Sequence, residues 1–181
     1  MAVMAPVYEK SRLKGHAAEV RAEGARAGYA PVVGAIHLEV AIERPAEVVW
    51  AYLSDPRHDV EWQLDVIHST HRPHGRIRVG TRKFKVRRTR FENQLVEVEY
   101  THLDHEAREW RDLVTVGILR GSTAHYQVVR YGQGSRVLVD LETTAPGLRR
   151  FVMPLVDRST SSDLAAYLDR LRAVLEARKA T

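Results

Sequence analysis

Apolar and polar residues begin to alternate at residue 36 of this chain, and the period of the pattern changes twice before the C-terminus. Residues 36–43, Ile-His-Leu-Glu-Val-Ala-Ile-Glu, place apolar side chains on one face of an extended chain, which predicts a half-buried strand. Pro45 then suits the first turn of a helix. Asp55-Pro56 ends that helix, and a second short helix is expected to run toward Trp62.

Beyond residue 64 the apolar residues recur at every second position, as they do in β-strands. Strand-like segments cover residues 81–91, 95–102, 110–116, 123–130 and 137–143, and residues 76–80 lead into the first of them. The residues between these segments are rich in Gly, Asn and Asp, which favour turns. Consecutive strands with connections this short predict an antiparallel meander.

The end of the chain returns to a helical period. A single apolar stripe is formed by Leu164, Leu168, Leu171 and Leu175. Helix is expected to begin near Gly147, with a kink or a brief break at Pro154 and the polar residues 159–162. The order of strand, two short helices, long sheet and long helix predicts an α+β domain in which a twisted antiparallel sheet grips one helix.

Two segments are more specific than these periods. The first is residues 44–50, Arg-Pro-Ala-Glu-Val-Val-Trp, followed by Asp55-Pro56, and the second is residues 155–158, Leu-Val-Asp-Arg, leading into residues 163–168. In this order they resemble the START/Bet v 1-like (SRPBCC) superfamily, and within it the polyketide cyclase/dehydrase-like group, over roughly residues 36–177. The resemblance implies a helix-grip fold, with a curved antiparallel sheet of about seven strands, two short helices and a long C-terminal helix over a cavity. In that superfamily the cavity holds a hydrophobic molecule.

Residues 1–35 depart from the superfamily pattern, in which the domain normally starts at the first strand. They are rich in Ala, Glu, Lys and Arg, but Gly residues interrupt the helical pattern. We expect a helical or flexible N-terminal extension over residues 1–35 and a ligand-binding domain over residues 36–181. A docked lid, or an arm that builds a homodimer, is the alternative for the extension.

The composition narrows the class of partner. The formal net charge of +5 comes from 28 Lys and Arg against 23 Asp and Glu, and the acidic residues are mixed among the basic ones almost everywhere. A nucleic-acid binder is expected to gather its cations on one face, so no nucleic-acid partner is expected. The chain has no Cys, which excludes disulfides and thiolate metal sites. No apolar run reaches the roughly 18 residues of a membrane span, and the N-terminus is a poor secretion signal, so a cytoplasmic location is expected.

Strand parity selects the residues expected to face the cavity, because successive side chains of a strand point to opposite faces. The concave face is expected to carry Phe84, Val86 and Arg88. The solvent face is then expected to carry Lys83, Lys85 and Arg87. Glu97 and Glu99 on the next strand can pair there with Lys85 and Arg87, so these charges are interpreted as structural.

The polar residues expected in the cavity suggest acid–base chemistry. The catalytic candidates are Arg88, Tyr100, His102 and Asp112. A carboxylate that orients a His beside a Tyr hydroxyl could move protons in an aldol cyclisation or dehydration, while Arg88 stabilises an enolate. Such a site needs no metal and no organic cofactor. A satisfied polar network in the core looks identical in sequence, and Arg88 could instead reach solvent or pair with Asp112.

The candidates for ligand contact are mostly apolar or aromatic. They are Trp62, Phe84, Val86, Val98, Trp110, Val114, Tyr126, Phe151, Met153 and Val156. Tyr167 is a further candidate on the C-terminal helix. His68, His71 and His74 suggest a metal, but on a strand they cannot converge without a bend and no acidic residue lies between them, so no metal site is expected.

These residues build a cavity without identifying its ligand. The leading interpretation is a protein that binds a small hydrophobic or aromatic molecule, polyketide- or lipid-like, with apolar walls supplying most of the affinity. The alternative is a polyketide cyclase/aromatase-like enzyme that uses acid–base chemistry without a cofactor. A third interpretation is an interaction module acting through residues 1–35 or an exposed sheet edge.

Overall fold

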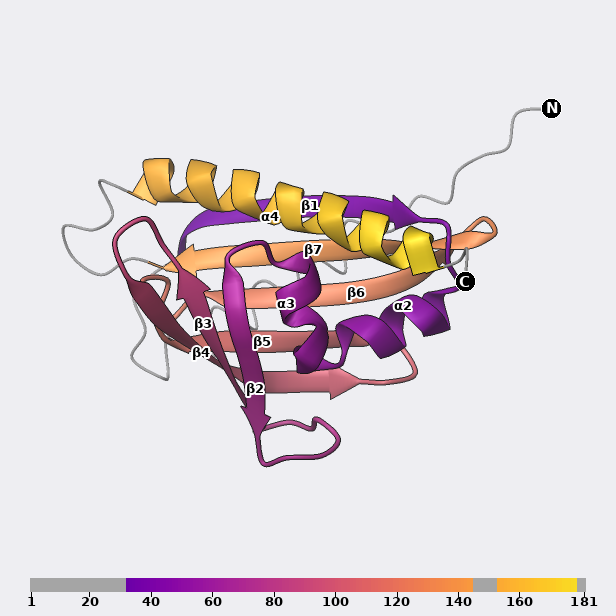
Figure 1. Cartoon of the computed structure of the whole chain (residues 1–181), viewed down its shortest axis with the longest axis horizontal. Coiled ribbons are helices and arrows are strands. Elements are labelled where there is room, and N and C mark those ends of the chain that lie inside the picture. The colour runs from indigo at the N-terminus through magenta and orange to yellow at the C-terminus, as the bar shows by residue number, and fades with distance from the viewer. Residues whose placement is uncertain (1–31, 145–152, 179–181) are drawn as a thin grey trace.

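A single antiparallel sheet forms the body of the protein. The computed structural model describes residues 32–144 and 153–178. The strands follow the order β1-β7-β6-β5-β4-β3-β2 (Figure 1). Their bounds are β1 (Val32–Ile42), β2 (Val66–Arg72), β3 (Arg82–Arg88), β4 (Asn93–Asp104), β5 (Glu109–Val116), β6 (Thr123–Tyr131) and β7 (Gly134–Thr144). The predicted antiparallel meander is confirmed, and β1 begins at Val32, before the residue at which the sequence period starts.

β1 forms one edge of the sheet and pairs with β7, the last strand of the meander. The register matches Val40 with Val137 and Ile42 with Ser135, so the end of β1 meets the start of β7. A Cβ atom on Gly134 would lie only 2.3 Å from the carbonyl oxygen of Ile42. Glycine at this position therefore lets the β6–β7 hairpin approach the backbone of β1.

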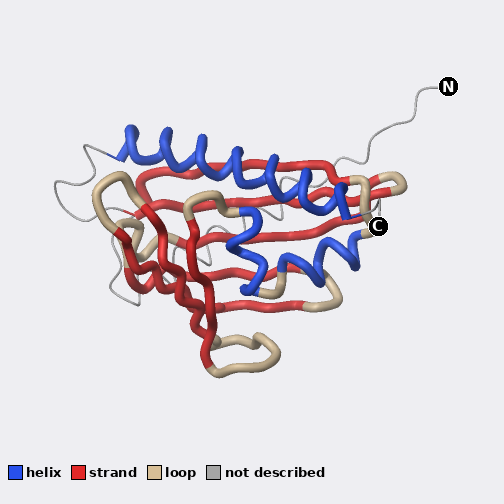
Figure 2. The backbone as a smooth tube through the Cα atoms, in the orientation of Figure 1, coloured by secondary structure: helices blue, strands red, loops and turns tan. Residues whose placement is uncertain are grey.

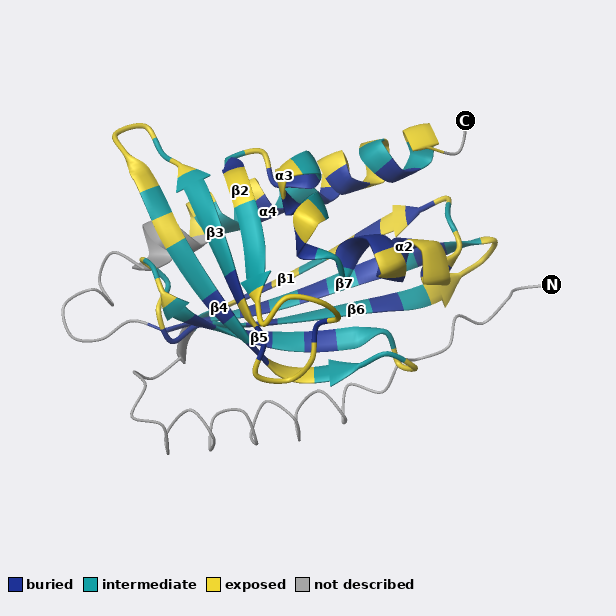
Figure 3. Ribbon diagram, turned by 60° about the horizontal axis from the view of Figure 1, so that its bottom comes forward, coloured by how far each residue is buried: buried dark blue, intermediate teal, exposed yellow. Residues whose placement is uncertain are grey.

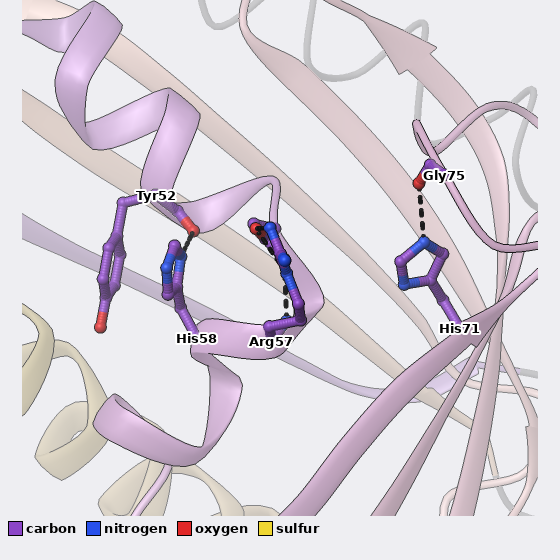
Figure 4. Close-up of polar contacts among 6 residues, drawn as sticks. Tyr52, Arg57, His58, His71 and Gly75 are labelled. Carbon is purple, nitrogen blue, oxygen red and sulfur yellow. Dashed lines mark hydrogen bonds and ion pairs between the residues drawn. The ribbon is translucent and has the colours of Figure 1, made fainter.

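Two short helices connect β1 to β2, as predicted. They are α2 (Ala46–Leu53) and α3 (Asp59–Trp62), joined through the 3-10 turn η1 (Pro56–His58). The ring of His58 stacks on that of Tyr52 with 4.2 Å between centroids, and its Nδ1 donates to the Tyr52 carbonyl oxygen at 2.9 Å (Figure 4). The backbone N–H of Arg57 donates to the Asp55 carboxylate at 3.0 Å. These contacts fix the angle between α2 and α3.

The long helix α4 (Met153–Ala177) lies across the sheet beside β1 and also contacts α3 (Figures 1 and 2). The predicted apolar stripe is confirmed, since Leu164, Leu168, Leu171 and Leu175 are all buried. The expected break at residues 159–162 does not occur, because these residues lie within one continuous helix. The expected start near Gly147 falls outside the described residues.

The core lies where the helices meet the inner face of the sheet (Figure 3). Its most buried members include Val49, Val128, Val137, Val139 and Leu171. Trp50 on α2 contacts Trp110 on β5, with 5.5 Å between ring centroids. Apolar burial thus holds α2 against β5, β6 and β7, and holds α4 against β1.

The opposite face of the sheet carries a row of alternating histidines and carboxylates. Asp140 lies 2.6 Å from His37 and 3.7 Å from His125, and these contacts lower its pKa. Glu109 lies 3.5 Å from His125 and 3.2 Å from His102. The row crosses five strands and marks this face as the solvent side. Within the described residues, no helix is long and apolar enough to cross a membrane.

Replacing Leu171 by Ala is expected to test the packing of α4 on the sheet. Leu171 is fully buried, so Leu171→Ala should lower the free energy of unfolding by about 2–5 kcal/mol. Leu64, which is 65% exposed, supplies the matched control, and Leu64→Ala should change stability by less than about 0.5 kcal/mol. Urea denaturation measures both. Equal losses in the two variants would contradict the packing described for α4.

Candidate functional site

Three cations line the inner face of β3, which reverses the predicted parity of this strand. Lys83 is 5% exposed and contacts α3, whereas its neighbour Arg82 and the more distant Arg88 are exposed. Phe84 and Val86 are half-buried on the outer face with Arg88. The prediction that these three face the cavity is therefore wrong. It assumed that apolar side chains mark the concave face, but acidic partners on the helical side allow charged side chains to point inward.

The cross-strand ion pairs expected for Glu97 and Glu99 form with a different residue of β3. Arg82 pairs with Glu97 at 3.4 Å and with Glu99 at 3.2 Å on the outer face. Lys85 and Arg87, which were expected to make these pairs, face inward instead. The charges of the inner face consequently need partners from the helices.

Lys83 finds its partner in the first residue of α3. Its Nζ lies 3.3 Å from Oδ2 of Asp59, and the side chains are 6% and 1% exposed. Ser69 on β2 donates to the same oxygen at 3.1 Å. Burial alone would lower the pKa of Lys83, but the attraction of Asp59 and nearby acidic groups outweighs it and raises the pKa. Lys83 is thus charged, and its contact with Asp59 joins β3, β2 and α3.

Lys85 faces inward beside this pair but has an amide as its neighbour. Its Nζ donates to Oε1 of Gln63 at 3.2 Å. Burial, followed by repulsion from Lys83, lowers the pKa of Lys85 to about 8. A substantial fraction of this amine is therefore neutral in mildly alkaline solution.

Arg87, near the end of β3, belongs to a three-membered network that reaches α4. Its Nε donates to Oδ2 of Asp65 at 2.6 Å, and its Nη2 donates to the Tyr167 hydroxyl at 3.0 Å. The same hydroxyl donates to Oδ1 of Asp65. Burial and the hydrogen bond to Asp65 raise the pKa of Tyr167. The network ties β3, the segment before β2 and α4 together at one point.

Of the four predicted catalytic residues, two come together. Tyr100 and Asp112 are cross-strand partners on β4 and β5, and they are 1% and 5% exposed. Burial raises the pKa of Asp112, and it raises the pKa of Tyr100 to about 12. Trp110 Nε1 donates to Asp112 Oδ2 at 3.4 Å.

The other two predicted catalytic residues, Arg88 and His102, lie on the outer face of the sheet. Arg88 is exposed, and His102 is exposed and contacts Glu109 at 3.2 Å. A register shift between Tyr100 and His102 turns the strand by one position, so His102 no longer shares the face of Tyr100. The structure therefore does not bring the four residues together around one cavity.

A cavity of about 300 Å³ lies between the sheet and the first half of α4. Its floor on β6 and β7 consists of Ala124, Tyr126, Val139 and Leu141. The β5–β6 connection adds Ile118 and Leu119. The helix contributes Ser159, Thr160, Asp163, Leu164 and Tyr167, and β3 contributes Arg87. The cavity thus has an apolar floor and polar groups along the helix and at the β3 end.

The predicted ligand-contact residues divide into four groups, of which the first, Phe84 and Val86, lies on the outer face. Tyr126 and the further candidate Tyr167 line the cavity. The inner-face or core positions are Val98, Trp110, Val114 and Trp62, which are 4%, 2%, 7% and 2% exposed. Phe151 and the side chains of Met153 and Val156 fall outside the described residues. Strand parity placed Arg87 on the wrong face, and a search for an acidic partner in the turn between α3 and β2, where Asp65 lies, could have found it.

A second hollow, of about 720 Å³, lies near the C-terminal end of α4. It is lined by charged and polar groups such as Arg172, Glu176 and Gln133, together with Ile42 and Tyr131. We assign the candidate site to the smaller cavity, because that one opens onto the apolar inner face of the sheet. Among the described residues, no group of His, Asp and Glu side chains is arranged to hold a metal ion.

The sequence profile described as polyketide cyclase / dehydrase and lipid transport matches residues 34–176. The chain belongs to this family. The matched residues run from within β1 to within α4, so the cavity lies inside the matched region. Membership of the polyketide cyclase/dehydrase and lipid transport family implies a cavity that binds a hydrophobic ligand. No curated protein matches the chain.

Solved structures share the fold of this family member. Ara h 8.0201 matches with a TM-score of 0.58 and 13% identity, covering 76% of this chain and 97% of its own. A point mutant of norcoclaurine synthase from Thalictrum flavum, in complex with a transition-state analogue, matches with a TM-score of 0.61 and 19% identity. The match covers 81% of this chain and 96% of the synthase chain. The protein TTHA0849 from Thermus thermophilus matches with a TM-score of 0.56 and 23% identity, covering 78% of this chain and 99% of its own. At these identities the likeness shows the Bet v 1-like fold alone.

The buried pair of Lys83 and Asp59 predicts a specific pattern of stability in this family member. Asp59→Ala should lower the free energy of unfolding by about 3–5 kcal/mol, because it leaves Lys83 charged and buried without its partner. Adding Lys83→Met to Asp59→Ala should recover most of that loss. Urea denaturation of the two single variants and the double variant measures the coupling. A double variant no more stable than Asp59→Ala would refute the pairing.

Lys85 predicts how stability changes with pH. Below pH 8 its amine is charged in both states, and burial of that charge penalises the folded state. Between about pH 8 and pH 10 the folded protein releases this proton first, so the unfolded state binds more protons and the free energy of unfolding rises with pH. Relative to Lys85→Met, the wild type should gain on the order of 1–3 kcal/mol across this window. Urea denaturation at several pH values measures the difference, and a constant difference from pH 7 to 10 would contradict the assignment.

Proposed function

We propose that the protein binds a small hydrophobic or aromatic molecule, polyketide- or lipid-like, in the cavity between β6, β7 and α4. The observation that carries this proposal is the cavity of about 300 Å³ with an apolar floor formed by Ala124, Tyr126, Val139 and Leu141. This volume lies at the lower end of the range of roughly 300–1,000 Å³ that is typical of ligand pockets. The site therefore suits a compact ligand of one or two fused rings, or a short acyl chain.

The apolar floor would supply most of the binding energy. Each square ångström of apolar surface removed from water contributes about 25 cal/mol, so a body that buries about 200 Å² gains about 5 kcal/mol before the cost of association. Polar groups at the helix and at Arg87 would then orient the ligand, as the few polar groups of such pockets usually do.

The comparisons support binding of a small organic molecule. The family description includes lipid transport, and one solved structure of the same fold, norcoclaurine synthase, holds a transition-state analogue. The cyclase alternative required Arg88, Tyr100, His102 and Asp112 to converge on one cavity. Because Arg88 and His102 lie on the outer face, we propose binding in place of catalysis by this set.

Filling the cavity is expected to abolish binding. Ala124 lies on the floor and is 7% exposed, so Ala124→Phe places a ring where the ligand would lie. The uncharged fluorescent probe N-phenyl-1-naphthylamine should bind the wild type and lose at least about tenfold in affinity in Ala124→Phe. Fluorescence titration measures the affinity, and native mass spectrometry of freshly purified wild type should reveal a co-purifying small molecule.

The matched control is Ala35→Phe on β1, where the alanine is exposed. This variant should bind the probe as the wild type does. Thermal unfolding checks that both variants are folded. Equal affinity in all three proteins, or no probe binding by the wild type, would overturn the proposed function.

A further inference from the structure

At the β3 end of the cavity, Arg87 lines the wall, and two further hydrogen-bond donors, Trp62 and Lys85, lie close to Arg87 or Tyr167. We define the donor layer as Trp62, Lys85 and Arg87. Trp62 is 2% exposed, and its indole N–H has no acceptor among the described residues. Lys85 has three N–H groups, whereas the structure gives it the single acceptor Oε1 of Gln63. Buried donors without acceptors are costly, so this layer favours a bound group that accepts hydrogen bonds.

The donor layer adjoins the cavity through Arg87 and through the ring of Tyr167. Arg87 and Tyr167 both line the cavity, and the ring of Tyr167 contacts that of Trp62 edge-on, with 6.4 Å between centroids. Lys85 lies two positions before Arg87 on the same face of β3. In the described hydrogen bonds Arg87 uses Nε and Nη2, so Nη1 keeps its hydrogens for a ligand.

Among the described cations of this end, Lys85 has no carboxylate in direct contact. Lys83 is paired with Asp59 and Arg87 with Asp65, each in a direct contact. Lys85 contacts an amide. Asp163, which lines the cavity one turn before Tyr167, is exposed, so solvent screens its charge. Asp112 on β5 attracts the charge of Lys85, but burial raises the pKa of Asp112 and its carboxylate accepts a hydrogen bond from Trp110. An anion near Lys85 and Arg87 would give Lys85 a direct partner.

We propose that this end of the cavity binds the carboxylate, or a chemically equivalent monoanion, of a ligand whose apolar body rests on the floor formed by β6 and β7. Arg87 donates from Nη1, Trp62 supplies its indole N–H, and Lys85 contributes positive charge. This inference rests on the proposed function and names the class of ligand: a compact aryl or acyl carboxylate.

The affinity for such a ligand should depend on pH through Lys85. The groups that act on its amine are Lys83 and Arg87 on β3, Asp59 on α3 and Asp112 on β5. Binding of an anion favours the charged form of Lys85, so the affinity should fall as the pH rises above about 8, where that amine begins to lose its proton in the free protein. An uncharged ligand should show no such fall.

Isothermal titration calorimetry with 2-naphthoate and its uncharged analogue methyl 2-naphthoate tests the proposal. At pH 7 the wild type should bind 2-naphthoate about tenfold or more tightly than the ester, because hydrogen bonds to a charged group are stronger than those to a neutral one. Arg87→Gln should remove this preference while it leaves the affinity for the ester within about threefold. Arg88→Gln is the matched control, since it removes the adjacent arginine on the outer face, and it should keep the preference.

Two further variants keep the proposal testable if Arg87→Gln fails to fold. Trp62→Phe preserves the ring and removes the N–H, and it should lower the affinity for 2-naphthoate by about threefold or more without affecting the ester. Lys85→Met should abolish the fall in 2-naphthoate affinity above pH 8.

The outcomes separate the two proposals. Equal or tighter binding of the ester, or binding of N-phenyl-1-naphthylamine without binding of 2-naphthoate, would overturn the carboxylate site and leave the proposed function standing. A wild type that binds none of the three probes would overturn both. An Arg88→Gln variant that loses the preference as Arg87→Gln does would also overturn the site.

Discussion

The inward orientation of β3 depends on two carboxylates, Asp59 at the start of α3 and Asp65 directly before β2. Asp59 meets Lys83 and Asp65 meets Arg87, so the strand can turn its cations toward the helices. A buried charge without a partner costs several kcal/mol, and a shift of one residue would carry every side chain of the strand to the other face. The ion pairs therefore fix the register of the strand against the helices. The two ends of the sheet are held differently, because apolar packing fastens α4 to β1 whereas charge fastens β3 to α3.

The order of elements was predictable because it follows from local signals. Alternation with short turns predicts an antiparallel meander, and the leucine stripe of the last helix predicts the face that packs on it. The facing of β3 was not predictable by the same means. Lys83 owes its inward position to Asp59, which is 24 residues away in sequence and becomes a neighbour only when α3 folds against the sheet. A pattern within one strand contains no information about that partner.

The candidate site shows the same limit. Tyr126 and Tyr167 were predicted from aromatic character and do line the cavity, and Tyr100 and Asp112 were placed together correctly on the inner face. His102 was misplaced because a register shift after Tyr100 reverses the alternation, and no residue in that stretch signals the shift. Periodic arguments fail beyond such a point, since each one assumes that the strand is regular. The polar end of the cavity became visible only through contacts between segments.

The position of Trp62 makes the intrinsic tryptophan fluorescence of the protein sensitive to groups near the cavity. Trp50 and Trp110 contact each other in the core, whereas Trp62 stands apart from that pair and touches the ring of Tyr167 at the cavity wall. Indole emission responds to hydrogen bonding at the ring nitrogen and to charges nearby. Because the N–H of Trp62 has no acceptor among the described residues, a group that reached it would shift the emission wavelength of this tryptophan. Binding of the proposed ligand would then be followed by tryptophan fluorescence in unlabelled protein.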